Sequence, residues 1–416
     1  MSRALARRFT TGMVIASFAT LFSTLVSGCG GASSTTTTTP PTSSTSNVQA
    51  ISVTTGPAAA VGAPEVDIAY TSVTICVPGS TTQCQTIGGM LVDTGSSGVR
   101  VLSSALTLSL PQQKDSNGNP IAECAEFVDG ESWGPVQTAD ISMAGEKASS
   151  APIEVIGSPS FSNVPTGCSS LGPVEDDLAS FGANGIVGVG NYVQDCGDGC
   201  AISVSSGQNF GLYYTCPATG CEVTAQATAQ QVANPVASFA TDNNGVVIEL
   251  PQASGSEASL NGSMIFGIGT QSNNGLGSAT VYTIDPNTGN ITTTFNGQTY
   301  TDGAFLDSGS NAIYFLDAVT TGMTTCADLT FWYCPTSTQN FSATNVGANG
   351  ATGSFNFSIG NADLLTNDEN NGVAAGLGGP NPGAFDWGLP FFFGKSVYTA
   401  IEGRSTPGGQ GPYWAY

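Results

Sequence analysis

Two aspartates lie in matched surroundings far apart in the chain, and their residue type suits acid–base chemistry. Asp93 belongs to GGMLVDTGSSGVRVL, residues 88–102, and Asp307 belongs to DGAFLDSGSNAIYFL, residues 302–316. In register, Gly89 and Gly95 fall on Gly303 and Gly309, the two aspartates coincide, and aliphatic residues follow at matched positions. Asp-Thr-Gly is also ordinary turn chemistry, so one copy alone would predict only a turn. Two copies indicate a duplicated unit, with one carboxylate from each half of the chain.

The sequence contains no histidine, and this narrows the chemistry available. A Ser-His-Asp or Cys-His nucleophile system is excluded, as is a zinc site that uses imidazole. Proton transfer must then depend mainly on carboxylates. When two carboxylates are held close together, their repulsion raises the pKa of one, so a single shared proton leaves one acid and one base. Such a pair can activate a water and protonate a leaving group without a covalent intermediate.

These motifs resemble those of the pepsin-like aspartic peptidases, whose paired Asp-Thr/Ser-Gly-Ser/Thr segments match DTGSS at Asp93 and DSGS at Asp307. Weaker landmarks follow in the family's order: NGIVGVGN at 184–191, GSMIFGIGT at 262–270 and FDWGLPFFFGKSVYTAIEG at 385–403. The resemblance covers roughly residues 60–405. It implies an all-β, bilobal fold with two pseudo-two-fold related lobes, each giving one aspartate loop. We also identify the chain with an uncharacterised bacterial lipoprotein branch of this fold.

The resemblance implies a role for each residue of the two loops. Asp93 and Asp307 would hold the attacking water and share a proton. The supporting residues of the loops would be Ser96 and Ser310, which orient the carboxylates, Thr94 and Ser308, which brace the loops from behind, and the motif glycines Gly95 and Gly309.

The family's substrate-covering flap also has a match, although with departures. EFVDGESWG, residues 126–134, fits the flap hairpin, with Phe127 at the usual tyrosine position and Gly130 at a family glycine. Arg100 stands where the family usually has a tryptophan, and Asp386 interrupts the second hydrophobic-hydrophobic-Gly segment. These departures leave both aspartates in place but remove the flap hydroxyl.

Two functions from different classes therefore stay open, because a fold does not fix a function. We favour an aspartic endopeptidase that acts on a peptide or protein substrate. The alternative is a catalytically silent scaffold, a binding or structural lipoprotein of the cell envelope that holds a peptide or protein ligand.

The first 28 residues have the architecture of a signal peptide, with three arginines followed by an apolar run over residues 13–26. LVSGC resembles a lipoprotein box, so we expect Cys29 to become lipidated. A plain secretory signal with cleavage nearby is the alternative. Gly30 follows Cys29, which in Gram-negative bacteria favours transport to the outer membrane.

Composition divides the rest of the chain into a tether and two lobes. Residues 29–50 are rich in Ser and Thr and predict a flexible tether. We expect an N-terminal β lobe over 51–232 with Asp93 and a C-terminal β lobe over 233–416 with Asp307. Residues 30–99 contain no Lys or Arg, so we expect no basic prosegment of the kind found in pepsin-like zymogens.

The chain carries 30 acidic and 8 basic residues, for a formal net charge of −22. This charge argues against nucleic acid or an anionic membrane surface as a partner. We expect contact with the membrane only through the lipid anchor, a monomer, and neither cofactor nor metal.

Ten cysteines remain when Cys29 is assigned to lipid, an even number that suits an oxidising compartment. None forms a Cys-x-x-Cys pair of the kind typical of zinc sites, so disulfides are favoured over a metal. Short separations and elimination suggest the pairs Cys76–Cys84, Cys196–Cys200, Cys216–Cys221, Cys326–Cys334 and Cys124–Cys168, although spacing does not fix the connectivity.

Overall fold

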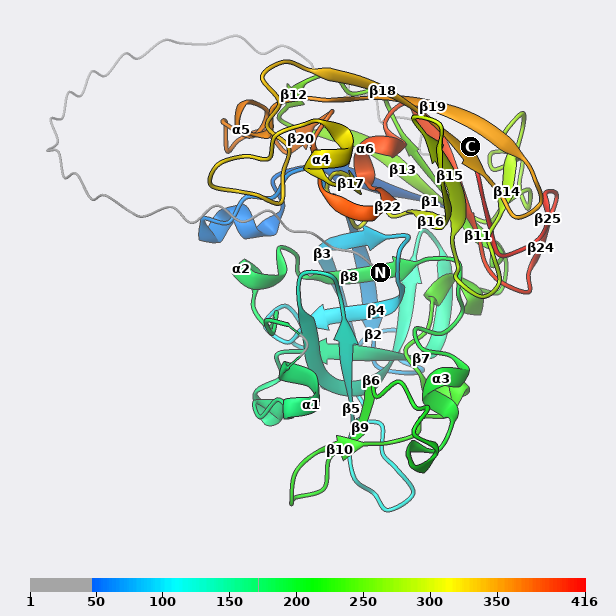
Figure 1. The fold of residues 1–416 in the computed structure, drawn as a ribbon. Helices are drawn as coiled ribbons and strands as arrows, with labels where there is room; N and C mark the ends of the chain where they lie inside the picture. Colours follow the sequence, from blue (N-terminus) through cyan, green and yellow to red (C-terminus); the bar gives the residue numbers. More distant parts are fainter. Residues whose placement is uncertain (1–46, 171) are drawn as a thin grey trace, which may run out of the picture.

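The structure, a computed structural model, describes residues 47–170 and 172–416, which form two β-rich lobes lying one above the other (Figure 1). The expected all-β, bilobal fold is confirmed. The predicted signal peptide, the lipidation site Cys29 and residues 29–46 of the predicted tether lie outside the described residues.

The N-terminal lobe is a closed sheet, because β6 bonds to β2 as well as to β5 and β7. Its buried strands are rich in Val and Ile, which suit a strand covered on both faces. Its strands are β2 (Ala69–Cys76), β3 (Cys84–Asp93), β4 (Ser97–Leu102), β5 (Ile121–Glu126), β6 (Glu131–Met143), β7 (Glu146–Ile156), β8 (Gly185–Val189), β9 (Tyr213–Thr215) and β10 (Glu222–Val223).

The C-terminal lobe is built around a seven-stranded sheet of order β19-β18-β15-β16-β22-β17-β21. Those strands are β15 (Ile291–Phe295), β16 (Gln298–Leu306), β17 (Ile313–Leu316), β18 (Gln339–Val346), β19 (Thr352–Ile359), β21 (Gly378–Gly379) and β22 (Asn381–Trp387). The lobe also contains β11 (Gly245–Leu250), β12 (Ser256–Glu257), β13 (Leu260–Phe266), β14 (Val281–Thr283), β20 (Val373–Ala374), β23 (Lys395–Ala400), β24 (Ser405–Thr406), β25 (Gly409–Gln410) and β26 (Tyr413–Ala415).

One strand joins the two lobes: β1 (Val48–Val53) pairs with β2 of the N-terminal lobe and with β13 of the C-terminal lobe. Through β1 the N-terminal sheet continues into β13, β11, β23, β26 and β14. Residues 48–50, which composition placed in the tether, therefore belong to this strand. They pair with β13 through backbone bonds, and the short Val-Gln-Ala stretch next to the Ser/Thr-rich tract did not reveal this pairing.

The core of the C-terminal lobe is aromatic. Phe315 and Phe385 stack with ring centroids 5.9 Å apart, and Phe385 lies 5.2 Å from Trp387. These three side chains are fully buried directly behind the loop that carries Asp307. Packing of this kind fixes strand positions, because densely packed rings tolerate little movement.

The helices are short and add no layer to the fold. The α-helices are α1 (Thr166–Ser169), α2 (Leu178–Phe181), α3 (Asp198–Ala201), α4 (Ala318–Thr321), α5 (Ala362–Leu365) and α6 (Leu389–Phe392), and the 3-10 helices are η1 (Pro57–Val61), η2 (Pro159–Phe161), η3 (Val204–Ser206), η4 (Thr228–Gln230) and η5 (Pro235–Ser238). Among the described residues, no helix has the length and apolar character required to cross a membrane.

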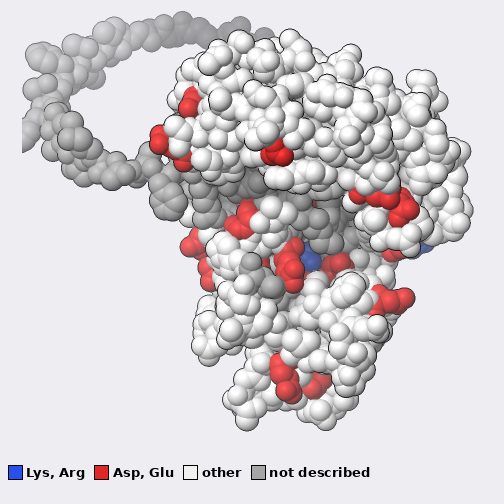
Figure 2. Space-filling view, in the orientation of Figure 1, with Lys and Arg blue, Asp and Glu red and all other residues white. Residues whose placement is uncertain are grey.

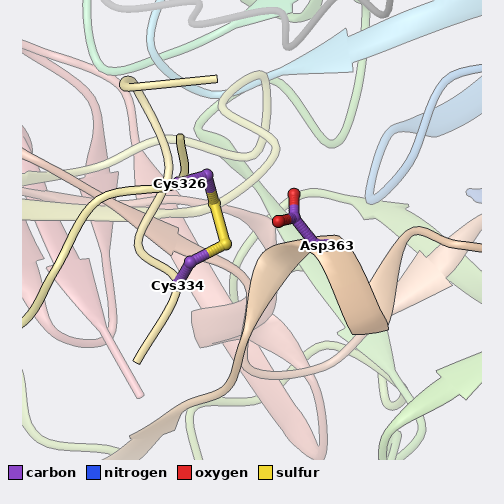
Figure 3. Close-up of side chains that lie close together, drawn as sticks. All are labelled: Cys326, Cys334 and Asp363. Carbon is purple, nitrogen blue, oxygen red and sulfur yellow. A yellow bond between two sulfur atoms is a disulfide. The ribbon is translucent and has the colours of Figure 1, made fainter. Parts of the chain in front are cut away.

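All five disulfides form as the spacing suggested. The pairs are Cys76–Cys84, Cys124–Cys168, Cys196–Cys200, Cys216–Cys221 and Cys326–Cys334. Asp363 of α5 directs its carboxylate toward the Cys326–Cys334 bond (Figure 3). These two sulfurs are bonded to each other, so the group lacks the thiolates that a metal site of this kind requires.

Candidate functional site

Each aspartate is held at the end of a buried strand that lies beside a second strand of its own lobe. Asp93 ends β3, which runs parallel to β8 with Asp93 opposite Gly188. Asp307 follows β16, which runs parallel to β22 with Leu306 opposite Trp387. The same local unit therefore places one carboxylate at the lobe junction from each side, as the duplicated motif predicted.

The two carboxylates meet at this junction. Asp93 is 3% exposed and Asp307 is 1% exposed. A Cβ built on Gly309 would lie 2.7 Å from Asp93 Oδ1 and 3.1 Å from Asp307 Oδ1, so both oxygens approach one point. A Cβ on Gly95 would lie 2.6 Å from Asp307 Cγ. A side chain at Gly95 or Gly309 would collide with a carboxylate, which explains why both motif positions are glycine.

Each carboxylate accepts hydrogen bonds from its own loop. The amide of Gly95 donates to Asp93 Oδ1 at 2.6 Å, and Ser96 Oγ donates to Asp93 Oδ2. The corresponding bonds in the second loop run from the Gly309 amide to Asp307 Oδ1 at 2.8 Å and from Ser310 Oγ to Asp307 Oδ2 at 3.0 Å. These bonds fix the orientation of both carboxyl planes.

Thr94 and Ser308 brace the loops from behind, in the arrangement that the resemblance implied. The Ser308 amide donates to Thr94 Oγ1 at 2.9 Å, and the Thr94 amide donates to Ser308 Oγ at 3.1 Å. Each hydroxyl also donates to the opposite strand, Ser308 Oγ to Val92 O at 2.9 Å and Thr94 Oγ1 to Leu306 O at 3.4 Å. The brace therefore ties the two lobes together.

We predict that Thr94→Val lowers the free energy of unfolding by about 1–3 kcal/mol, because it leaves the buried Ser308 amide without an acceptor. The control is Thr74→Val, which breaks an exposed hydroxyl pair with Thr86 and should change stability by less than about 0.5 kcal/mol. Urea unfolding of both variants measures the difference. Equal stability of the two variants would contradict a role for the brace.

Burial raises the pKa of Asp307 well above its usual range, and the neighbouring charge of Asp93 raises it further. The charge of Asp386 and a hydrogen bond with Asp93 act in the same direction. A proton therefore remains in this group of carboxyls at a pH where an exposed aspartate is ionised. The pair can present one acid and one base together.

Phe127 and Gly130 lie in the turn between β5 and β6, where the Phe127 amide donates to Gly130 O at 2.7 Å. The segment proposed as the flap therefore forms a hairpin, and its role as a flap stays a prediction. Phe127 lines a cavity of about 440 Å³ together with Ser96, Arg100 and Phe210. Gly130 does not line that cavity; a Cβ there would lie 2.4 Å from Pro173 O, so the glycine permits close backbone packing.

A second cavity, of about 300 Å³, also adjoins the Asp93 loop. Its lining includes Thr94, Ser96, Asn191 and Leu306. Figure 2 shows the molecule hollowed between the lobes, with acidic side chains gathered on both sides of the hollow. Ser96, whose hydroxyl donates to Asp93, lines both cavities.

A family model described as a protein of unknown function, DUF3443, matches residues 43–416. The chain belongs to this family. No curated protein matches the sequence. The crystal structure of aspartic proteinase from Irpex lacteus is similar in structure, with a TM-score of 0.48 and 14% sequence identity over 88% of this chain and 96% of that chain.

In this member of the DUF3443 family, Arg100 has a setting that the sequence did not reveal. Its guanidinium contacts Glu123 at 2.5 Å, Asp195 at 3.0 Å and Glu154 at 3.3 Å, and all of these side chains are buried. Arg100 Cζ also lies 6.0 Å from the centre of the Phe127 ring. The arginine therefore contacts both the Phe127 ring and a buried acidic cluster.

Asp386 is the second residue that departs from the pepsin-like motif pattern. The structure shows its surroundings. Asp386 lies in β22, is 1% exposed, and its Oδ2 lies 2.7 Å from Ser310 Oγ, the hydroxyl that also contacts Asp307. The sequence marked Asp386 as an interruption, but no motif connected it with Ser310.

Proposed function

We propose that this protein is an aspartic endopeptidase that hydrolyses peptide bonds with a water held between Asp93 and Asp307. The observation that supports this most strongly is the approach of the two buried carboxylates to one point from matched loops. Binding alone would not require two acidic side chains to be buried together, since this arrangement raises the pKa of Asp307 and costs stability.

In the proposed reaction the ionised carboxyl accepts a proton from the water, which attacks the peptide carbonyl carbon. The protonated carboxyl donates its proton to the carbonyl oxygen, and a later proton transfer releases the amine. Ser96 and Ser310 keep the carboxyl planes oriented through their hydrogen bonds. Held in place by the loops, both groups react without prior reorganisation.

The substrate we propose is an unfolded or extended peptide. We propose that the cavities of about 440 and 300 Å³, both lined by Ser96, each receive a side chain of the bound peptide strand. Phe127 would cover such a strand from the flap. The absence of a tyrosine hydroxyl there removes one hydrogen-bond donor but leaves the ring in place.

The second candidate is a catalytically silent protein that binds a peptide in the same hollow, and Phe127 and Arg100 favour it. Incubation of the purified protein with denatured casein between about pH 3 and 7 separates the two, since optimal acid–base catalysis depends on both protonation states. New amino termini indicate a peptidase. Retention of the peptide without cleavage indicates the binding protein.

We also propose that the protein is a lipoprotein of the bacterial outer membrane, anchored through Cys29. Cys29→Ser is then expected to move the protein from the membrane fraction to the soluble periplasmic fraction, because the lipid acceptor is lost. The free energy of unfolding should not change. Ser34→Ala in the same tract is the control and should stay in the membrane fraction. A Cys29→Ser protein that remains membrane-bound would contradict lipid anchoring.

A further inference from the structure

The hydroxyl of Ser310 has two carboxylate neighbours but only one hydrogen. Its oxygen lies 3.0 Å from Asp307 Oδ2 and 2.7 Å from Asp386 Oδ2. An ionised carboxylate only accepts hydrogen bonds, so one of these two contacts would lack a hydrogen if both acids were ionised. A proton on one of the two acids completes both contacts.

The surroundings of Asp386 favour the proton there. Its Oδ1 is buried and has no hydrogen-bond partner, which is far less costly for a neutral carbonyl oxygen than for an ionised carboxylate. Burial raises the pKa of Asp386 well above its usual range, the hydrogen bond from Ser310 lowers it in part, and the charge of Asp93 raises it. No lysine or arginine of the described residues forms an ion pair with it.

The titratable groups that face Asp386 come from three elements. Asp307 follows β16, Tyr314 of β17 lies opposite Asp386, and Asp93 comes from the N-terminal lobe. The Tyr314 hydroxyl donates to Asn311 at 2.7 Å and burial raises its pKa, so this phenol stays neutral wherever the carboxyls titrate. The other two groups are the proposed catalytic carboxyls.

The N-terminal lobe provides an internal comparison. There the residue that corresponds to Asp386 of β22 is Ile186 of β8. Ile186 lies opposite Arg100 of β4, just as Asp386 lies opposite Tyr314 of β17. Ser96 Oγ has the single carboxylate partner Asp93. The additional acid is therefore specific to the Asp307 side of the site.

We propose that Asp386 is a positioning residue for the reaction proposed above: it holds a proton, donates it to Ser310 Oγ and so directs the serine hydroxyl toward Asp307. Ionisation of Asp386 turns that hydroxyl away from Asp307 and adds a negative charge beside it. The upper pH limit of cleavage is therefore set by Asp386 rather than by the shared proton of Asp93 and Asp307.

The test compares wild type with Asp386→Asn, whose amide donates to Ser310 as the neutral acid does, and with Asp386→Leu, which resembles the isoleucine of the other lobe. Both remove the ionisation, so the high-pH limb of kcat/KM is expected to move upward by about one pH unit or more. If the shared proton of Asp93 and Asp307 set the limb instead, removing the negative charge of Asp386 would lower the pKa of that pair. A limb that stays in place or moves to lower pH would therefore overturn the proposal.

A second readout does not depend on cleavage. Infrared spectra at about pH 6 should show a protonated-carboxyl carbonyl band in wild type that loses intensity in both variants, since a buried acid can stay neutral at that pH. Unchanged band intensity would refute the proton on Asp386. If wild type cleaves nothing, the peptidase proposal fails while this measurement still decides the protonation of Asp386.

Discussion

Asp307→Asn is expected to reduce kcat/KM for an unfolded protein substrate by at least about 10³-fold, because it removes one of the two groups that transfer protons. The substitution preserves size and leaves the Gly309 amide an acceptor in the asparagine oxygen, while the asparagine NH2 takes the place of Oδ2 and can donate to Ser310 Oγ. Asp93→Asn should have a similar effect. A continuous assay with a labelled casein measures both variants beside wild type.

The stability of Asp307→Asn separates chemistry from folding. The pKa of Asp307 is raised in the folded state, so wild type loses stability as the pH rises through that value, whereas the variant does not. The variant should therefore unfold at a temperature near or above that of wild type at neutral pH. Asp302→Asn, in the strand β16 that precedes Asp307, is the matched control and should retain activity. An inactive control, or an active Asp307→Asn, would contradict the assignment.

The free energy of unfolding is expected to fall as the pH rises from about 4 to 8. Among the described residues, six buried carboxyls have raised pKa values in the folded state, chiefly because burial disfavours their charge: Asp67, Glu131, Glu154, Asp195, Asp307 and Asp386. Each keeps its proton when folded but loses it when unfolded, so its contribution is complete below the unfolded pKa and is lost as the pH approaches the folded value. Hydrogen bonds from Asn287 and Thr288 lower the pKa of Asp285. The contribution of such groups to the free energy of unfolding is lost only at more acidic pH.

Asp67 provides the clearest measurement of this effect, because burial raises its pKa to about 8. Asp67→Asn keeps an acceptor for the Ala374 amide, and asparagine tolerates the positive φ of 52° at this position. At pH 8 the variant should be more stable than wild type by up to about 5 kcal/mol, with little difference at pH 4. Thermal unfolding at both values tests this. Asp328→Asn on the surface is the control, and equal shifts in both variants would refute the role of Asp67.

The parts of the site that the sequence predicted are those built from local repeats. The two Asp-x-Gly-Ser segments carry their own turn, carboxylate and supporting hydroxyl, so Asp93 and Asp307 could be paired without knowledge of the sheet. The turn that holds Phe127 and Gly130 is also local in sequence, but its match to a flap came from the family resemblance and stays a prediction. The disulfides also followed mainly from short separations in the sequence.

Contacts between distant strands could not be predicted from one sequence. Arg100 of β4 meets Glu123 of β5 and Glu154 of β7 because of the order of strands in the closed sheet. Asp386 reaches Ser310 because β22 lies beside β16, and residues 48–50 become a strand through pairing with β13. Strand register places these residues, and composition carries little information about register.

The most direct test of the shared-proton peptidase is the pH dependence of kcat/KM for unfolded casein, measured with purified wild type between about pH 3 and 7. Circular dichroism at each pH establishes that the protein is folded. We predict cleavage that is fastest at acidic pH and fades toward neutral pH as the carboxyls of the site lose their protons. A folded protein that is inert over the whole range, or one whose rate rises toward neutral pH, would contradict a peptidase built on Asp93 and Asp307.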